Sequence, residues 1–392
     1  MASHEILPSE HPGEFIAEEL EARNWSQADL AFVLGWDTSL LNRLIKGNMN
    51  ITPDSANMLG DAFDMPAEFF MNLQKMHDLG RAKKADPGVK TRASWAAVFP
   101  VREMIKRGWI EDTESSLLDV QMVRFFGRSR RDEVPFVSEA PVIAHAARKT
   151  PYAEILPSQY AWLHRVRSVA RTVDCPTYSE NALRSVLATL RAHFIDPDDL
   201  PRIPALLKQC GVRLVLVEHM TGSKIDGVCT WLDEQPVIGL TNRLDRIDNL
   251  CFVLRHEIEH VLRGDGREET FSPIDEFDGN LGSGNPNLPE CEVLANTAAA
   301  DFCVDQAMLQ SFILRKSPYI SEKDVRAFAA RAQIHPAIVI GQIQHKTNRH
   351  NWLRKYQTSI RAFLKEWEAV AAAPDRETTR FSTRITHDQE PR

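Results

Sequence analysis

Apolar residues recur every three or four positions over residues 12–74, a spacing that predicts short amphipathic helices. Gly35 and Gly47 stand where helices would end, because glycine adopts the left-handed conformation of a helix C-terminus without strain. Ser26 and Asp37 stand at N-cap positions, where a side-chain oxygen accepts hydrogen bonds from the first free N–H groups of a helix. The pattern predicts a compact helical domain at the N-terminal end.

The next stretch changes character. Residues 75–95 lose the periodicity and gather Lys, Arg, Thr and an Asp-Pro-Gly run, so we expect a linker there. Apolar residues return at helical spacing over residues 96–200, as in YAWLHRVRSVART and ENALRSVLATLRAHF. No motif in this stretch carries chemistry, and we interpret it as a helical connector.

Strand-like runs begin after residue 201. A helix that stops before Gly211 is followed by VRLVLVE, and then by GVCTWLD and PVIGLTN, which the turn residues DEQ separate. An amphipathic helix, NLCFVLRHEIEHVLRG, comes next and ends at Gly264. Residues 265–289 are rich in Gly, Pro and Asp and predict a long loop. Helical patterns follow at 289–309, 322–332 and 351–371, before a polar tail that we expect to be disordered.

Composition narrows the class of protein. The chain has 392 residues, 43% hydrophobic and 26% charged, as expected for a soluble globular protein of two or three domains. No apolar run approaches the roughly 18–20 residues that a membrane span needs, and the N-terminal residues lack a signal-peptide pattern. The six cysteines form no CxxC pair, which favours reduced thiols over a disulfide framework. We expect a cytoplasmic protein with no membrane partner.

Charge is distributed unevenly along the chain. Residues 1–80 hold four Lys/Arg against thirteen Asp/Glu, a net charge of −9, whereas residues 81–110 hold eight against two, a net charge of +6. An acidic N-terminal domain is unfavourable for DNA binding, because neutralised phosphates supply much of the affinity. The basic stretch could compensate by following the phosphates beside a docked helix.

The sequence HEIEH at 256–260 is the strongest candidate site. His256 and His260 lie four residues apart, which places both imidazoles on one helix face within reach of one metal ion. Glu257 is placed to act as general base toward a metal-bound water. The competing interpretation is a surface helix with solvated histidines. The apolar residues of its opposite face, among them Val253 and Leu254, argue instead for a helix fixed in a core.

A downstream helix offers the remaining ligand. Glu292 is the favoured third ligand, and Asn296, one turn further, is expected to support the site through a hydrogen bond to a ligand histidine. Glu290, Asp301 and the acidic residues of 265–278 are alternatives that spacing alone leaves open. The two strand-like runs before the HEIEH helix suggest an edge that binds a peptide backbone by strand addition.

These motifs resemble a known family. GVCTWLDEQPVIGLTN, FVLRHEIEHVL and ECEVLANTAAADF together resemble the ImmA/IrrE metallopeptidase domain over residues 227–305. The resemblance implies a zinc cofactor, strengthens the assignment of Glu292, and implies cleavage of a partner repressor or antitoxin. One residue departs from the family pattern: Glu259 replaces the glycine that usually precedes the second histidine, which puts turnover in doubt more than metal binding.

The N-terminal domain carries a second resemblance. Residues 11–74 are similar to the HigA-like branch of the Xre helix-turn-helix family. The segment DTSLLNRLIKG would enter the major groove of double-stranded DNA N-terminus first, and its core face would be formed by Leu40, Leu41 and Leu44. Its outward face would present donors to bases and phosphates: Thr38, Ser39, Asn42, Arg43 and Lys46.

The expected fold class is α+β and predominantly helical, with a helix-turn-helix domain, a helical connector and a zincin-like domain that contains a small sheet. The expected divisions are 1–75, 76–200, 201–372 with a helical C-terminal extension, and a disordered tail at 373–392.

The combined prediction is a homodimeric regulator that binds a DNA operator and carries a zinc-dependent metallopeptidase. Two alternatives remain. The chain could be a HigA-type antitoxin or repressor, with a cognate toxin as partner and a structural or sensory metal domain. It could also be a peptidase whose helix-turn-helix only docks a protein substrate.

Overall fold

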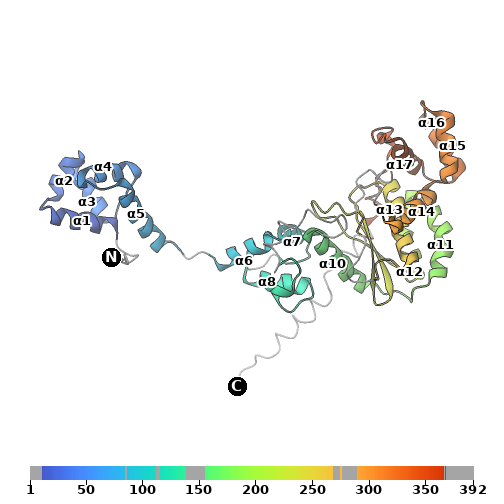
Figure 1. Ribbon diagram of the computed structural model, residues 1–392, viewed down its shortest axis with the longest axis horizontal. Coiled ribbons are helices and arrows are strands. Elements are labelled where there is room, and N and C mark those ends of the chain that lie inside the picture. Colours follow the sequence, from blue (N-terminus) through green and yellow to red (C-terminus); the bar gives the residue numbers. More distant parts are fainter. Residues whose placement is uncertain are drawn as a thin grey trace, which may run out of the picture. The chain divides into compact units, whose positions relative to one another are not determined.

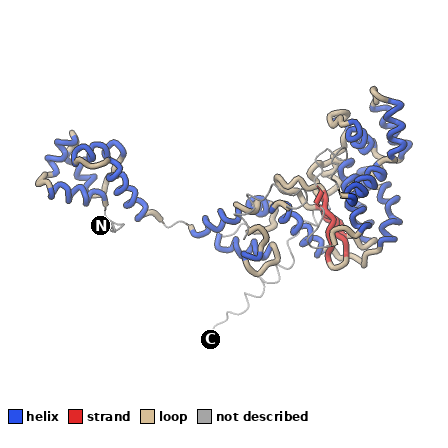
Figure 2. The backbone as a smooth tube through the Cα atoms, in the orientation of Figure 1, coloured by secondary structure: helices blue, strands red, loops and turns tan. Residues whose placement is uncertain are grey.

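The structure is a computed structural model that describes residues 11–83, 86–111, 115–137, 155–267, 274–275, 289–365 and 367. The chain divides into two compact units, Met1–Asp86 and Pro87–Arg392. Helices dominate both units, and the strands lie in the second (Figure 2). The expected α+β, predominantly helical fold class is confirmed.

Unit 1 is a bundle of short helices (Figure 1). Ser26 and Asp29 form a capping box at the start of the second helix, and the carboxylate of Asp37 accepts the N–H of Ser39 at 2.8 Å. Gly35 ends the second helix with a φ of 64°. The predicted caps are therefore confirmed. The helices are α1 (Pro12–Ala22), α2 (Gln27–Leu34), α3 (Thr38–Ile45), α4 (Pro53–Phe63) and α5 (Ala67–Arg81).

The expected linker over residues 75–95 is largely helical instead. Helix α5 continues to Arg81 because Gln74 and His77 are buried in unit 1, where the Gln74 side-chain oxygen accepts the Ile51 N–H at 2.8 Å. Helix α6 (Pro87–Ala96) then begins at a proline and buries Trp95 in unit 2. Only a few residues are left to connect the two units.

Unit 2 is built around a four-stranded sheet of order β1-β3-β2-β4. Strands β2 (Gly227–Leu232) and β3 (Gln235–Leu240) form an antiparallel hairpin, and β1 (Arg213–Leu216) pairs parallel with β3. Strand β4 (Ile274–Asp275) pairs antiparallel with β2 at Gly227 and Val228. The sequence predicted the first three strands, whereas β4 lies in the segment expected to be a loop.

Helices cover both faces of this sheet, which explains why every residue of β2 is buried. On one face Cys229, Trp231 and Ile238 belong to the core that contains the HEIEH helix. On the other face Val228 and Val237 pack with α10 (Pro157–Thr172).

Helix α10 lies directly on the sheet. The Trp162 indole N–H donates to the Val217 carbonyl at 3.1 Å, and a Cβ on Gly239 would lie 2.7 Å from Val166. The segment predicted as a connector is therefore a layer of unit 2, and the structure has no division at 200–201.

The HEIEH helix is α13 (Ile247–Arg263), and it packs against α14 (Glu290–Cys303). The helix expected over 289–309 is interrupted after α14, because Val304 is extended and Asp305 caps a new helix. The other helices among the described residues of unit 2 are α7 (Val101–Lys106), α8 (Ser115–Phe125), η1 (Arg131–Glu133), α11 (Glu180–Ala192), η2 (Pro197–Arg202), α12 (Ile203–Gln209), α15 (Gln306–Lys316), α16 (Glu322–Ala332), α17 (Pro336–Thr347) and η3 (Arg354–Tyr356).

The helix predicted at 351–371 is wrong for most of its described length. Turns and η3 precede helical residues at Lys365 and Trp367. The Asp245 carboxylate accepts the N–H groups of Ile360 and Arg361, which holds this stretch in a non-helical path.

All six cysteines are free thiols, as expected. Within the described part of the chain, no helix combines the length and apolarity needed to cross a membrane. The predicted tail at 373–392 lies outside the described residues.

Candidate metal centre and nucleic-acid interface

Helix α13 presents its histidines inward. Its apolar residues anchor it in the core, and Gly264 ends it with a φ of 76°. His256, Glu257 and His260 are each 0% exposed, so the predicted face is buried and not a solvated surface. The interpretation of HEIEH as a surface motif is excluded by this burial.

Helix α14 brings a carboxylate to the two histidines. Glu292 Oε2 lies 3.3 Å from His256 Nε2, and Glu292 Oε1 lies 3.5 Å from His260 Nε2. The two Nε2 atoms are 3.0 Å apart. These three side chains form a group whose ligand atoms all lie within 4.8 Å of one another and could hold a metal ion. Sequence spacing alone could not decide the third member, because it belongs to another helix.

The alternative third ligands whose side chains are described do not join this group. Glu290 and Asp301 are exposed on α14, and Asp265 contacts the opposite nitrogen of His260. The side chains of the other acidic residues in 265–278 lie outside the description.

The negative charge of Glu292 and the positive charge of His260 stabilise each other. Burial by itself would raise the pKa of Glu292, but hydrogen bonds from His256 and His260 outweigh it and lower that pKa well below its usual range. Burial likewise opposes a charge on His260, while hydrogen bonds to Glu292 and Asp265 raise its pKa. These directions favour an ionised Glu292 carboxylate beside a protonated His260 in a buried space, where a metal cation could take the place of the proton.

Glu257 follows His256 on α13, and its carboxylate lies against strand β2 of the sheet. A Cβ on Gly227 of β2 would stand 2.2 Å from Glu257 Oε1, so only the bare glycine backbone allows this approach. Gly227 was not identified from the sequence. Its position at the start of a strand-like run, one residue after Asp226, carries no signal of contact with α13.

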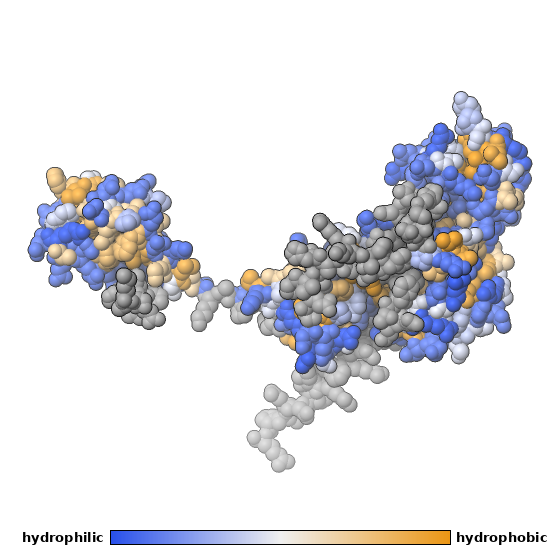
Figure 3. Space-filling view, viewed as in Figure 1, coloured by the Kyte–Doolittle hydropathy of each residue, from blue (hydrophilic) through white to orange (hydrophobic). Residues whose placement is uncertain are grey.

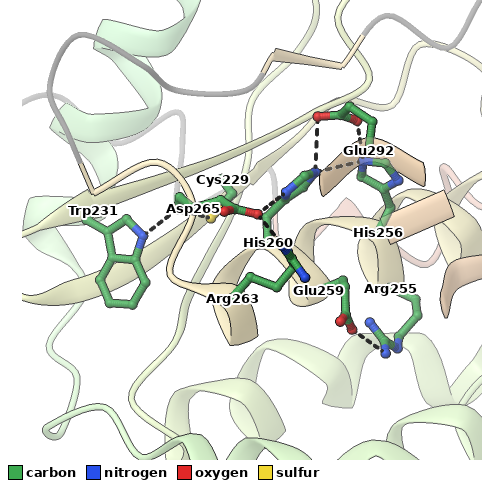
Figure 4. A network of polar contacts seen from close by, with 9 residues as sticks. All are labelled: Cys229, Trp231, Arg255, His256, Glu259, His260, Arg263, Asp265 and Glu292. Carbon is green, nitrogen blue, oxygen red and sulfur yellow. Dashed lines mark hydrogen bonds and ion pairs between the residues drawn. The ribbon is translucent and has the colours of Figure 1, made fainter. Parts of the chain in front are cut away.

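Glu259, the residue that departs from the family pattern, points away from the group. Its carboxylate pairs with Arg255 one turn earlier at 2.8 Å, and both side chains appear below the histidines in Figure 4. The pair lets a glutamate occupy this helix position without adding a charge to the group of His256, His260 and Glu292.

Asn296 does not support a histidine as predicted. It is half-buried, and its Oδ1 has no hydrogen-bond partner among the described residues. The side chain that contacts the opposite ring nitrogen of a histidine is Asp265, whose Oδ2 lies 2.9 Å from His260 Nδ1 (Figure 4). The Gly-Asp pair that follows the helix is the sequence signal for this contact, since a left-handed cap turns the chain back toward the helix.

The predicted recognition helix is α3. Thr38, Ser39, Arg43 and Lys46 are exposed, whereas Asn42 is half-buried and its Oδ1 is enclosed without a hydrogen-bond partner among described residues. Asn42 is therefore less available to DNA than predicted, because it is partly enclosed by the packing of unit 1. On the inner face Leu41 and Leu44 are buried as expected, and Leu40 is only half-buried.

The surface beside α3 is short of positive charge. Helix α2 contains no Lys or Arg, and its Phe32 and Val33 are 87% and 49% exposed. Hydrophobic residues accordingly reach the surface of unit 1 in Figure 3. Within α2, α3 and the residue that follows α3, the cations are Arg43 and Lys46, so these two side chains would supply the local attraction for phosphates.

Comparison with known proteins finds a helix-turn-helix family model that matches residues 16–70. The chain is similar to an addiction module antidote protein of a HigA family from Coxiella burnetii, with 35% identity, a TM-score of 0.18 and coverage of 19% of this chain and 82% of that one. It is also similar to PA4674 from Pseudomonas aeruginosa, solved in complex with its 18 bp operator DNA, with 32% identity, a TM-score of 0.20 and coverage of 22% and 92%. Comparison with curated proteins gives no match.

The N-terminal part of the chain is therefore a helix-turn-helix domain, as the sequence predicted. The family match ends at residue 70 and does not include His256, His260 or Glu292, so the resemblance of unit 2 to ImmA/IrrE metallopeptidases stays a prediction.

Proposed function

We propose that this chain is a DNA-binding transcriptional regulator whose second unit is a zinc-dependent metallopeptidase of the ImmA/IrrE type. The DNA-binding part rests on the family match over residues 16–70 and on the exposed polar face of α3. The peptidase part rests on one observation, the convergence of His256, His260 and Glu292, with the buried Glu257 directly after His256 on the same helix.

For DNA binding, α3 would lie in the major groove with its N-terminal residues toward the base edges. Thr38 and Ser39 would meet the bases or the nearest phosphates, while Arg43 and Lys46 would extend to the groove edge. A helix-turn-helix that reads a palindromic operator does so as a dimer, so we propose a homodimer on double-stranded DNA. The proposed interface uses few cations, and the net charge of −9 over residues 1–80 makes its affinity depend strongly on those few.

The dimensions of the metal-binding group suit zinc. In a tetrahedral site with bonds of about 2.0–2.1 Å, ligand atoms stand about 3.3–3.4 Å apart. The two histidine Nε2 atoms stand 3.0 Å apart, and each lies close to one oxygen of the Glu292 carboxylate: His256 at 3.3 Å from Oε2 and His260 at 3.5 Å from Oε1. Two imidazoles and one carboxylate form a ligand set that catalytic zinc uses, with the fourth position left for water. When bound, zinc supplies the Lewis acidity that makes this water a nucleophile near neutral pH.

The chain's own residues would do the rest of the chemistry. Glu257 would take the proton of the attacking water and return it to the leaving amine, which its place next to His256 allows. His256, His260 and Glu292 would hold the metal between α13 and α14. The arrangement supports hydrolysis of a peptide bond in a partner repressor or antitoxin, the substrates that the resemblance implies.

A peptide substrate would align along β2, the strand that touches Glu257. The sequence predicted an open strand edge here, but β4 pairs with β2 at Gly227 and Val228. The substrate backbone would therefore take the place of β4 beside these two residues. This exchange keeps the strand-addition mode of binding and requires the chain's own segment to leave.

A second function has a specific observation in its favour. The histidines are 0% exposed and Glu292 is 8% exposed, a degree of enclosure typical of a structural metal site. In that case the protein would be a repressor or HigA-type antitoxin, paired with a toxin, whose metal domain stabilises or senses. Catalysis needs the enclosure to open, whereas a structural role does not.

The deciding experiment measures metal and turnover in the same preparations of the full-length chain. We expect about one zinc per chain by elemental analysis, and cleavage of peptides from a defined peptide library read by mass spectrometry. Glu257→Gln should keep the zinc and lose cleavage. Glu259→Gln is the matched control on the same helix, and it should keep both because Glu259 pairs with Arg255.

Each outcome separates the alternatives. Absence of zinc, or unchanged zinc in His256→Ala, contradicts the proposed metal site. Zinc without cleavage in the wild-type chain favours the structural or sensory function. Equal cleavage by the wild type and Glu257→Gln contradicts the assigned base.

A further inference from the structure

The residue behind His260 is delivered by the turn that ends α13. Gly264 adopts a left-handed conformation, and the N–H of Asp265 donates to the His260 carbonyl at 2.9 Å. This turn reverses the chain, so the Asp265 carboxylate comes back to the last histidine of the helix. Its Oδ2 lies 2.9 Å from His260 Nδ1. A helix-capping turn thus places a carboxylate on the ring nitrogen that faces away from the metal-binding group.

This contact selects the form of His260 that can bind a metal. A neutral imidazole has one N–H and one lone pair. When Nδ1 donates its proton to Asp265, the lone pair is on Nε2, and Nε2 is the atom that faces His256 and Glu292. A carboxylate behind a ligand histidine also fixes the ring orientation and raises the basicity of the ligand nitrogen.

Asp265 is itself held by the sheet. The Trp231 indole N–H donates to the Asp265 carbonyl at 2.7 Å, and the Cys229 thiol lies 3.5 Å from the same oxygen. The guanidinium of Arg267 stacks over the Trp231 ring at 4.2 Å from its centroid. Figure 4 shows the chain of contacts from Trp231 through Asp265 to His260. Strand β2 therefore anchors the residue that orients the histidine.

A simple helix-end ion pair does not account for the geometry. Arg263 Nε is 3.5 Å from Asp265 Oδ2, the carboxylate oxygen that contacts His260, and the Arg263 side chain is 36% exposed. His260 is nearer, at 2.9 Å, and its side chain is fully buried. An exposed ion pair contributes little, whereas a charge-assisted hydrogen bond to a buried ring fixes its orientation.

We propose that Asp265 is the positioning residue for His260, that Trp231 holds Asp265 in place, and that together they set the affinity of the group for zinc. The inference rests on the proposed metal site and adds residues that neither HEIEH nor Glu292 includes. It assigns Asp265 a role in orienting a ligand and none in contacting the metal.

The test measures the affinity of the purified full-length chain for Zn²⁺ by competition with a chromophoric chelator. Loss of such an outer carboxylate typically lowers metal affinity about 10–100-fold, and we expect that loss for Asp265→Ala. Asp265→Asn should fall between this variant and the wild type, because its side-chain oxygen still accepts the Nδ1 proton without a charge. Trp231→Phe keeps an aromatic ring at this position but loses the indole N–H donor, and it should cause a smaller loss of affinity.

Glu259→Gln is the control, because it removes one negative charge from α13, the helix that carries His260, without touching the metal-binding group. The visible spectrum of bound Co²⁺ is a second measurement, since it responds to ligand geometry and not to a general loss of stability. It should change in Asp265→Ala and stay unchanged in Glu259→Gln.

The outcomes distinguish this inference from the proposed function. A wild-type chain that binds no Zn²⁺ contradicts the metal site itself. A wild-type chain that binds Zn²⁺, with Asp265→Ala equal to Glu259→Gln in affinity and in Co²⁺ spectrum, overturns the role of Asp265 alone. If Asp265→Ala does not fold, wild-type affinity in both Asp265→Asn and Trp231→Phe overturns it instead.

Discussion

Gly227 of β2 and Glu257 of α13 are in contact through the one position on the strand that has no side chain: a Cβ on Gly227 would stand 2.2 Å from Glu257 Oε1. The strand that would align a peptide and the carboxylate that would take the proton of water are thereby kept at a fixed separation. The contact links the fold of the sheet to the chemistry of the helix.

Gly227→Ala should disturb this contact. Glu257 is 0% exposed, so its carboxylate has little room to yield, and overpacking of this kind costs about 1–3 kcal/mol in the free energy of unfolding. We expect a loss in that range by urea unfolding. Peptide cleavage should also fall, as we expect for Glu257→Gln, with zinc retained, because the base is displaced while the ligands stay in place.

A double-mutant cycle identifies the cause. In a Glu257→Ala background the carboxylate is gone, and Gly227→Ala should cost less, with part of the strain left because Val253 also lies 2.7 Å from the added Cβ. Gly239→Ala is the matched control: its Cβ would meet Val166 and Val228, so its cost should not depend on residue 257. An equal cost of Gly227→Ala in both backgrounds would show that Glu257 is not the obstacle.

Removal of metal should destabilise unit 2 alone. The proposed ligands lie on α13 and α14, so zinc would cross-link two helices of unit 2, while unit 1 contains none of them. A ligand present at 100 times its Kd stabilises a fold by about 2.7 kcal/mol. Calorimetry of the full chain with a chelator should therefore lower one thermal transition and leave another unchanged.

His256→Ala supplies the comparison for this experiment. It should lose the response to chelator, because the site can no longer hold the metal. A wild-type chain whose transitions are the same with and without chelator and with added zinc would argue against any stabilising metal in unit 2.

Local spacing was enough to predict the elements of the site that lie on one helix. His256 and His260 share a face because they are four residues apart, and the burial of that face follows from the apolar residues around them. Glu292 required the resemblance as well as the spacing, because the approach of α14 to α13 is a tertiary contact. Ser26, Asp37 and Gly35 were predictable for the same local reason, since caps depend on neighbouring residues.

The predictions that were wrong concern features that depend on packing between segments far apart in the sequence. Nothing local in the sequence of α10 shows that it covers the second face of the sheet, and the short pairing of β4 with β2 involves two residues in a loop-like segment. Asn296 was chosen as a supporting residue by its helical offset from Glu292. The turn at Gly264 supplies Asp265 instead, because the direction of a reversed chain depends on the Trp231 contact as well as on the glycine.

DNA binding should depend strongly on Arg43, because few cations lie on or next to α3. Arg43 and Lys46 are the cations on and next to α3, in a region whose net charge is −9. Arg43→Ala should weaken operator binding and reduce the slope of log affinity against log salt by about 1 if its contact is to a phosphate. If it contacts a base, specificity should fall by about 1–3 kcal/mol.

Lys75→Ala is the control for charge. Lys75 is exposed on α5, so this variant changes the net charge of unit 1 by the same amount without altering α3. Fluorescence anisotropy with labelled DNA across a salt series compares the two. Equal behaviour of both variants would count against α3 as the recognition helix and favour the interpretation of unit 1 as a protein-interaction module.

The stability of unit 2 should fall in mild acid because of His164 on α10. Burial, and then the positive charges of Arg171 and Arg167, lower the pKa of His164 to about 4 from an ordinary value of 6.5, and its ring packs against Phe125 and Phe126 at 5.3 and 5.5 Å between centroids. The folded pKa lies below the unfolded one, so the unfolded chain binds more protons between these pH values. The stabilisation is present above pH 6.5 and is lost as the pH falls toward 4, by about 2–3 kcal/mol at pH 4.5.

Urea unfolding at pH 7 and pH 4.5 measures this loss in the wild type and in His164→Leu. The other titratable groups are the same in both proteins, so the loss of unfolding free energy should be larger in the wild type by the contribution of His164. Equal losses in the two proteins would mean that His164 is not held neutral by the fold.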